Sequence, residues 1–164
     1  MAHPTRLRSF DYVGFWRYFA TTCTHNRRPL FQNAATVAST IEQILQASSA
    51  EKCEVLAYCF MPDHVHLLVA GAAPEAEFLR FMKLAKQRSG WRYSRDAGAK
   101  LWQVGYHERV LRSDEATPDV IRYIVANPVS AGLVTAVEEY PYWGSATYSR
   151  EAILEFVSQS RCST

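Results

Sequence analysis

The sequence lacks the features of membrane, secreted and disulfide-rich or zinc-binding proteins. No apolar run approaches the roughly 20 residues that a helix needs to cross a bilayer, and residues 1–10 are polar and basic without the apolar core of a signal peptide. The four cysteines form no C-x-x-C pair, which gives little support to a structural zinc site or a dithiol. We therefore expect a cytoplasmic protein with no membrane partner.

The composition that is present fits one globular domain. The chain has 164 residues, of which 48% are hydrophobic and 13% aromatic, enough for a proper core. No repeat, linker or low-complexity segment divides it. We expect a single domain over residues 1–164, with a core of about 12–135 and a C-terminal extension of about 136–164 that either covers a site or closes the core.

Charge is divided unevenly along the sequence. Residues 1–112 carry 15 Lys and Arg against 9 Asp and Glu, a net of +6, whereas residues 113–164 carry 3 against 7, a net of −4. Between residues 80 and 95 the basic side chains alternate with Phe81, Trp91 and Tyr93. Such a surface suits a phosphate backbone, although a solvated helix face has the same composition.

Local patterns predict an α+β fold with the order β-α-β-β-α-β-α. Strands are predicted where aromatic and β-branched residues lie between turn signals, over residues 17–24, 54–60, 64–69 and 107–111. Helical spacing of apolar residues predicts helices over about 34–47, 74–95 and 113–126. The last helix is expected to end at Asn127-Pro128, since proline restricts the residue before it. This order is typical of a ferredoxin-like sandwich, an antiparallel sheet of four to five strands with helices mainly on one face.

Two histidines alternate with one aliphatic residue at the start of the third predicted strand. In the segment Asp63-His64-Val65-His66, the side chains of His64 and His66 share one face because strand side chains alternate. The rise per residue places them about 6 to 7 Å apart along the strand, where they can close on one metal ion if a third ligand arrives. A histidine pair of this kind also occurs as a structural or surface feature.

Tyr123 and Asn127 lie four residues apart on the last predicted helix, and hence on one face of it. If this face met the histidines, Asn127 would offer an amide oxygen to the metal, and Tyr123 a hydroxyl able to attack a polarised phosphate. Each residue also has a structural interpretation, Tyr123 as a core aromatic and Asn127 as the helix end. Only the combination of all four side chains favours a catalytic metal centre.

This combination resembles the single-tyrosine HUH transposases of bacterial insertion sequences, and in particular their REP-associated tyrosine transposase branch. Four sequence blocks occur in the order typical of that family and span most of the chain. They are Phe19–Phe31, Tyr58–Val69, Trp102–Arg112 and Tyr123–Val134.

The resemblance implies a set of roles and a reaction. His64, His66 and Asn127 would hold a divalent metal, Mg²⁺ or Mn²⁺, and Tyr123 would be the nucleophile. The implied reaction is the cleavage of single-stranded DNA near a hairpin, which leaves a 5′-phosphotyrosine link and a 3′ hydroxyl able to rejoin the strand without ATP. The protein would then associate with the nucleoid. The resemblance is compatible with a monomer or a homodimer, and with a mobile or an immobile gene.

Basic and aromatic residues are candidates for holding the DNA, because positive grooves and stacking aromatics bind single strands. Trp91 is equally expected to pack the second helix on the sheet, and Arg109 to form an ion pair with Glu108 or Asp114. The candidates are Arg27, Arg28, Lys83, Lys86, Trp91, Arg92, His107 and Arg109.

Two other classes of function fit the same residues. A ferredoxin-like sheet can bind nucleic acid without catalysis, here through Tyr58 and Phe60, although the sequence motif of that RNA-binding family is absent. In the second class, the metal of a small hydrolase would activate water instead of Tyr123.

Overall fold

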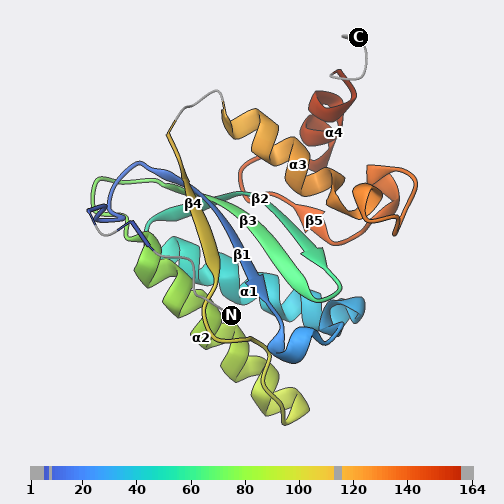
Figure 1. The fold of residues 1–164 in the computed structure, drawn as a ribbon, viewed down its shortest axis with the longest axis horizontal. Coiled ribbons are helices and arrows are strands. Elements are labelled where there is room, and N and C mark those ends of the chain that lie inside the picture. The colour runs from blue at the N-terminus through green and yellow to red at the C-terminus, as the bar shows by residue number, and fades with distance from the viewer. Residues whose placement is uncertain (1–5, 8, 113–115, 160–164) are drawn as a thin grey trace.

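A five-stranded antiparallel sheet forms the centre of the molecule (Figure 1). The computed structural model describes residues 6–7, 9–112 and 116–159. The strands are β1 (Arg17–Cys23), β2 (Cys53–Met61), β3 (His64–Gly71), β4 (His107–Leu111) and β5 (Trp143–Gly144). They pair in the order β4-β1-β3-β2-β5. The α+β class and the ferredoxin-like order of the first four strands are as predicted.

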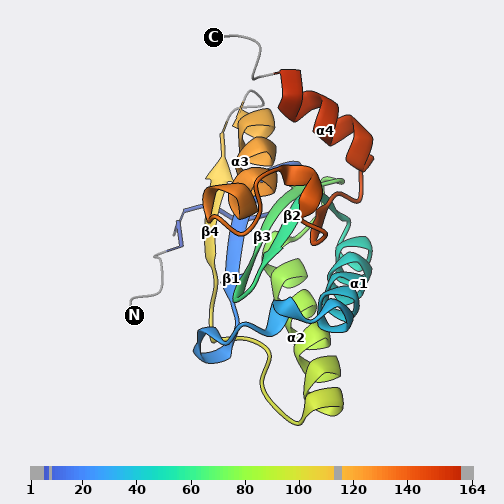
Figure 2. The ribbon, with the colours of Figure 1, turned by 90° about the vertical axis from the view of Figure 1, so that its right-hand side faces the viewer.

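The described residues form four α-helices, and both faces of the sheet carry helices. They are α1 (Ala34–Ala50), α2 (Phe78–Ala97), α3 (Ala116–Ser130) and α4 (Arg150–Gln159). Helices α1 and α2 pack together on one face, and α3 crosses the other (Figure 2). The expectation that helices lie mainly on one face is therefore wrong. It fails because β2 and β3 are apolar on both faces, so the second face also needs cover.

The second face has a hydrophobic cluster of its own. Leu56, Met61 and Leu68 from the sheet pack there with the buried side chains of α3, among them Ile121 and Ile124. The segment after α3 completes this cluster with Val137, Tyr140, Trp143, Ile153 and Val157. The described part of the C-terminal extension, to Gln159, therefore contributes to the core, which is one of the two roles expected for it.

Helix α3 runs through Pro128, where the sequence predicted its end. A proline cannot donate the bond to the carbonyl four residues earlier, but it does not force a helix to stop. Here Pro128 is buried, and the turn that contains it is closed by the amide of Leu133, which donates to the Pro128 carbonyl at 2.9 Å. Packing against the sheet thus outweighs the local preference. The predicted start at Ser113 falls outside the described residues.

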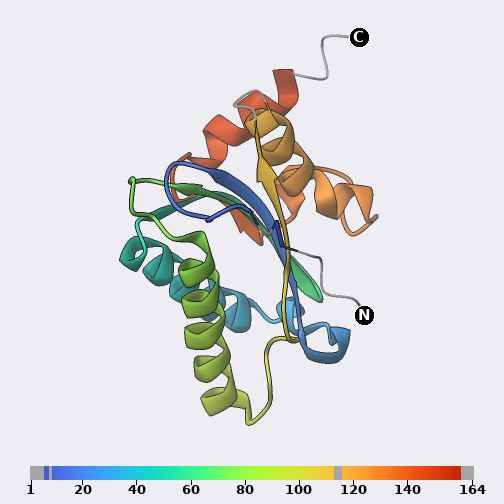
Figure 3. The same cartoon turned by 60° about the vertical axis from the view of Figure 1, so that its left-hand side comes forward.

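Helix α2 is the longest helix in the described part of the chain and extends past the end of the sheet (Figure 3). It ends at Gly98, whose φ of 66° lies in the left-handed region that favours glycine. No described helix is long and apolar enough to cross a membrane.

Candidate active site

The turn between β2 and β3 fixes the position of the histidine pair. The Pro62 carbonyl accepts a hydrogen bond from the amide of Phe31 at 3.0 Å, and the Asp63 carbonyl accepts one from the amide of Thr24 at 2.9 Å. The Thr24 hydroxyl donates a further bond to Asp63, at 3.1 Å. Because neighbouring segments hold both turn carbonyls, His64 begins its strand from a fixed point.

The two imidazoles converge through the same ring nitrogen. The Nε2 atoms of His64 and His66 lie 3.2 Å apart. Each Nδ1 has a partner on the protein, Asp63 Oδ1 at 2.7 Å for His64 and Thr21 Oγ1 at 2.8 Å for His66. Partners of this kind fix the ring orientation, so both Nε2 atoms are presented to one point in space.

Burial keeps His66 in the form that binds metals. Its side chain is only 7% exposed. Two effects lower the pKa of His66 from 6.5 to about 4: removal from water, which is the larger, and the nearby His64. His66 is therefore neutral at pH 7, as a metal ligand must be.

The pair fits a divalent metal ion. Two nitrogens bound at about 2.1 Å in a near-octahedral arrangement lie about 3 Å apart, close to the observed separation of 3.2 Å. Within the described residues, no group of three or more His, Cys, Asp and Glu could hold a metal. A third protein ligand would thus have to be an amide or hydroxyl, such as Asn127.

Asn127 follows Tyr123 by one helical turn, as the sequence predicted. Its Nδ2 donates to the carbonyl of Tyr123 at 3.3 Å, which leaves the side-chain oxygen as the atom able to bind a metal. The structure brings Asn127 to the same helix turn as Tyr123, and its ligand role stays a prediction.

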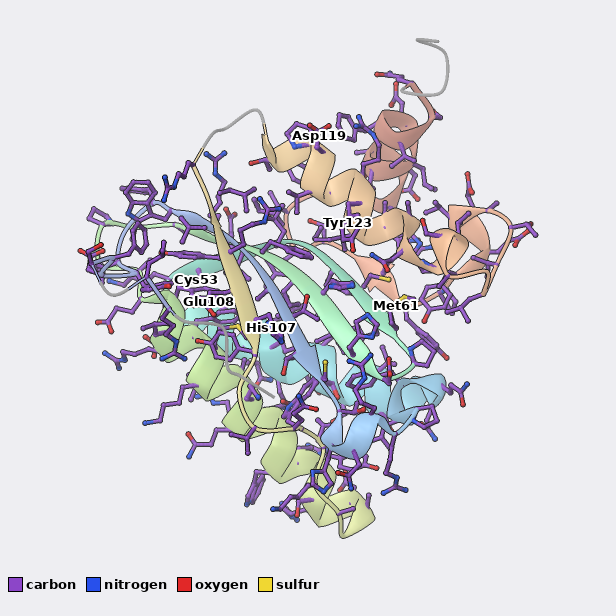
Figure 4. The ribbon with its side chains drawn as sticks, in the orientation of Figure 1. Cys53, Met61, His107, Glu108, Asp119 and Tyr123 are labelled. Carbon is purple, nitrogen blue, oxygen red and sulfur yellow. The ribbon has the colours of Figure 1, made fainter. Side chains whose placement is uncertain are left out.

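Tyr123 lies beside the histidine pair in the same chain. Its ring centroid is 6.0 Å from that of His66 and 5.8 Å from that of Phe19. The tyrosine projects from α3 over the sheet (Figure 4) and is 56% exposed. The interpretation of Tyr123 as a core aromatic is therefore wrong, and its hydroxyl is free to meet a ligand.

A surface hollow of about 400 Å³ opens next to Tyr123 between α3 and the β1–β4 edge. It is lined by Phe19, Arg109, Asp119, Val120 and Tyr123. The Asp119 carboxylate accepts a hydrogen bond from Arg122 at 2.9 Å. The hollow therefore joins an exposed phenol to a guanidinium, a combination suited to a phosphate group.

Arg109 does not form the ion pair expected with Glu108. Glu108 lies on the other face of the sheet, where it accepts a hydrogen bond from Tyr12 at 3.0 Å. The other expected partner, Asp114, is outside the described residues. Arg109 instead places its guanidinium 5.9 Å from the centre of the Phe19 ring.

Four of the predicted DNA contacts share the side of the sheet or the turn that carries the histidines. Arg109 lines the hollow beside Tyr123, and His107 pairs across strands with Thr21, the partner of His66. Arg27 and Arg28 follow β1, and the Nε of Arg27 is 3.0 Å from Asp63 Oδ2. These four lie near Tyr123 or the histidine pair, and their contact with DNA stays a prediction.

The other four predicted contacts, Lys83, Lys86, Trp91 and Arg92, lie on α2, across the sheet from the histidines. Lys86 donates hydrogen bonds to the carbonyls of Gln103 and Gly105, so its ammonium is already used within the protein. Trp91 is 62% exposed and lies under Arg95, which excludes the alternative that it packs α2 on the sheet. A strand of DNA at Tyr123 would have to turn around the sheet edge to reach this group.

Sequence reasoning missed the residues that support the pair. The sequence pattern does not single out Thr21, Phe19 or the side chain of Asp63, although all three lie within the four blocks. Alternation along β1 places Phe19 and Thr21 on one face. The pairing of Thr21 with His66 was the missing information, because strand register is a tertiary property.

The fold and the site together define a ferredoxin-like α+β protein with a histidine–tyrosine centre. The family model described as "Transposase IS200 like" matches residues 15–127, well over half of the chain, including both histidines, Tyr123 and Asn127. The chain belongs to the IS200-like transposase family.

A named relative agrees with this placement. A Haemophilus influenzae protein named "Putative REP-associated tyrosine transposase" is 30% identical over an alignment of 105 residues, and the match covers 54% of this chain and 57% of that protein. This chain therefore matches little more than half the length of that relative.

Solved structures share the fold. The structure of a REP-associated tyrosine transposase bound to a REP hairpin has a TM-score of 0.70 and 19% identity, and the match covers 85% of this chain and 82% of that one. A bacterial tRNA(His) guanylyltransferase-like protein in complex with GTP has a TM-score of 0.53 and 10% identity over 93% of each chain. Since proteins of different activity share the fold, function must be argued from the site.

Proposed function

We propose that this protein cuts and rejoins single-stranded DNA through a covalent bond between Tyr123 and a 5′ phosphate, in DNA transposition or in the processing of REP hairpins. The observation that carries the proposal is the exposed Tyr123 ring 6.0 Å from His66, whose Nε2 converges with that of His64. An enzyme of this kind acts in the cytoplasm, at the nucleoid.

The chemistry assigns a separate role to each group. The Tyr123 oxygen forms a bond to phosphorus and loses its proton to water, while the bond from phosphorus to the 3′ oxygen breaks and that oxygen takes up a proton. Because the tyrosyl ester keeps the energy of the broken bond, a 3′ hydroxyl can later attack it and release Tyr123. The protein thus rejoins DNA without a nucleotide cofactor.

His64, His66 and Asn127 are the residues that would hold Mg²⁺ or Mn²⁺. When bound, such an ion supplies Lewis-acid polarisation of the phosphate. The protein's part is to present two lone pairs, which Asp63 and Thr21 do by occupying both Nδ1 atoms. Imidazole ligands favour Mn²⁺, whereas abundance favours Mg²⁺.

A DNA hairpin is the proposed substrate. The structural relative bound to a REP hairpin supports this choice, as does the position of Arg27, Arg28, His107 and Arg109 around the site. Contacts to phosphate make affinity depend strongly on salt, so hairpin DNA is expected to bind more weakly as salt rises.

The decisive experiment incubates the protein with hairpin-bearing single-stranded DNA and Mn²⁺ and looks for an adduct stable in denaturing gels. We predict that Tyr123→Phe abolishes the adduct and leaves DNA affinity and melting temperature unchanged, since only the hydroxyl is lost. Tyr148→Phe, at another exposed tyrosine, is the matched control and should retain the adduct.

The outcomes separate the candidate functions. Undiminished cleavage by Tyr123→Phe would contradict the tyrosine mechanism and favour a metal-activated water. Hairpin binding by the wild type without cleavage or adduct would favour a binding module. Activity that persists in chelator, or after both histidines are changed to alanine, would remove the metal from the proposal.

A further inference from the structure

Phe19 connects the three chemical groups of the site. Its ring stacks on His66 at 5.4 Å between centroids, meets the edge of Tyr123 at 5.8 Å and lies 5.9 Å from the guanidinium carbon of Arg109. One side chain thereby contacts a proposed metal ligand, the proposed nucleophile and a cation. Arg109 and Tyr123 therefore contact the same aromatic ring.

The sheet itself determines this position of Arg109. Phe19 on β1 and Arg109 on β4 are directly opposite each other in the register, so their side chains share one face. Arg109 is exposed and lines the hollow next to Tyr123. Its aromatic contact orients the guanidinium without occupying its hydrogen-bond donors.

The charges around Arg109 leave it available to an anion. In the described part of the chain, no carboxylate lies within ion-pair distance of Arg109. Asp119 lines the same hollow, but Arg122 binds its carboxylate at 2.9 Å. Glu108, the next residue on β4, faces away toward Tyr12. As far as the described residues show, a phosphate entering the hollow would meet a guanidinium that no carboxylate pairs.

We propose that Arg109 is a further catalytic residue, which binds the non-bridging oxygens of the phosphate that Tyr123 attacks. This inference rests on the proposed function. The planar guanidinium fork matches two phosphate oxygens, and it stabilises the charge that shifts onto them as the tyrosine–phosphorus bond forms and the bond to the 3′ oxygen breaks. Arg109 keeps its protons throughout.

Three variants of Arg109 separate this role from a structural one. Arg109→Gln removes the charge, Arg109→Met also removes it but keeps apolar cover over Phe19, and Arg109→Lys keeps a point charge without the fork. We expect the single-turnover rate of adduct formation to fall about 10²- to 10³-fold in the Gln and Met variants, and less in the Lys variant. Arg112→Gln removes the same charge just after β4 and should leave the rate unchanged.

A second readout does not depend on the reaction. In chelator, hairpin affinity measured by fluorescence anisotropy should change less than about fivefold in Arg109→Gln, and the slope of log affinity against log salt should fall by about one, the loss of one phosphate contact. Melting temperatures should match the wild type.

Each alternative result has a distinct meaning. A wild-type rate in Arg109→Met would show that Arg109 only covers Phe19, and an equal loss in Arg112→Gln would show a general charge effect. Either result would overturn the role proposed for Arg109 and would leave the proposed function of the protein standing. If the wild type binds hairpin DNA but forms no adduct, the proposed function fails, and an unchanged salt slope would then overturn the phosphate contact as well.

Discussion

Two side chains outside the histidine pair decide how that pair is held. Asp63 accepts from His64 with one carboxylate oxygen and is within 3.0 Å of the Arg27 Nε with the other. Thr21 is the corresponding partner of His66, with its Oγ1 2.8 Å from the His66 Nδ1. Partners of this sort orient a ligand before the metal arrives, so less ordering remains to be done on binding.

We predict that Asp63→Ala weakens Mn²⁺ binding about 10- to 100-fold, because His64 loses the partner that fixes its ring. The measurement is a calorimetric or electron-paramagnetic-resonance titration of Mn²⁺ in the absence of DNA. Asp96→Ala is the control, since Asp96 bonds Arg92 on α2, across the sheet. An unchanged affinity in Asp63→Ala would show that the turn backbone alone orients His64.

At the scale of the elements, the alternation of strand residues and the spacing of helical residues predicted which side chains share a face of one element. They did not predict how the elements pack on each other. The sequence placed His64 and His66 on one face of β3 and Tyr123 and Asn127 on one turn of α3, and all four are arranged so. It did not reveal that α3 covers the sheet face opposite α1 and α2, or that the helix continues through Pro128. Both depend on packing between distant segments, which no local window contains.

Lys86 illustrates the same limit on α2. The sequence shows a lysine in a basic, aromatic segment and predicts a DNA contact. In the structure its ammonium binds the carbonyls of Gln103 and Gly105 and fixes the loop that leads into β4. Burial lowers the pKa of Lys86 from 10.5 to about 8, an effect that only the folded chain produces.

This shift predicts a pH dependence of stability. Between about pH 8 and 10.5 the unfolded chain binds the Lys86 proton and the folded protein does not, so the free energy of unfolding gains a contribution that rises with pH. The difference between wild type and Lys86→Met in urea unfolding should therefore grow in favour of the wild type across this window. The control is Lys83→Met, at the exposed lysine three residues earlier, which should keep the wild-type dependence of stability on pH. If Lys86→Met also kept this dependence, Lys86 would not be its source.

At the scale of the whole molecule, the sheet separates two tasks. The face covered by α1 and α2 contains a wholly structural core in which, for example, Tyr18 and Phe78 stack at 4.0 Å. The face covered by α3 carries both a core and the histidine–tyrosine centre. One chain thus contains both the histidines and the tyrosine that faces them.

It follows that inactive variants should not rescue each other. Tyr123→Phe and His66→Ala, mixed in equal amounts, are expected to form no more adduct than either alone, because the Tyr123 and His66 rings lie 6.0 Å apart within one chain. The measurement is the covalent adduct on hairpin DNA. The control is wild-type protein mixed with an equal amount of His66→Ala. The wild-type half of this mixture should still form the adduct. Restored adduct in the mixture would show that two chains exchange their helices.

The alternation along β3 has a consequence for the cell. Val65, Leu67 and Val69 enter the core under α1 and α2 because His64 and His66 point the other way. A register error of one residue would carry both histidines into the core under α1 and α2 and turn the three aliphatic side chains toward the site face, so a molecule with a misdirected site would also lose its core packing and unfold. Cellular proteases remove unfolded chains. Molecules with a misaligned site are therefore expected to be degraded and not to accumulate in the cell.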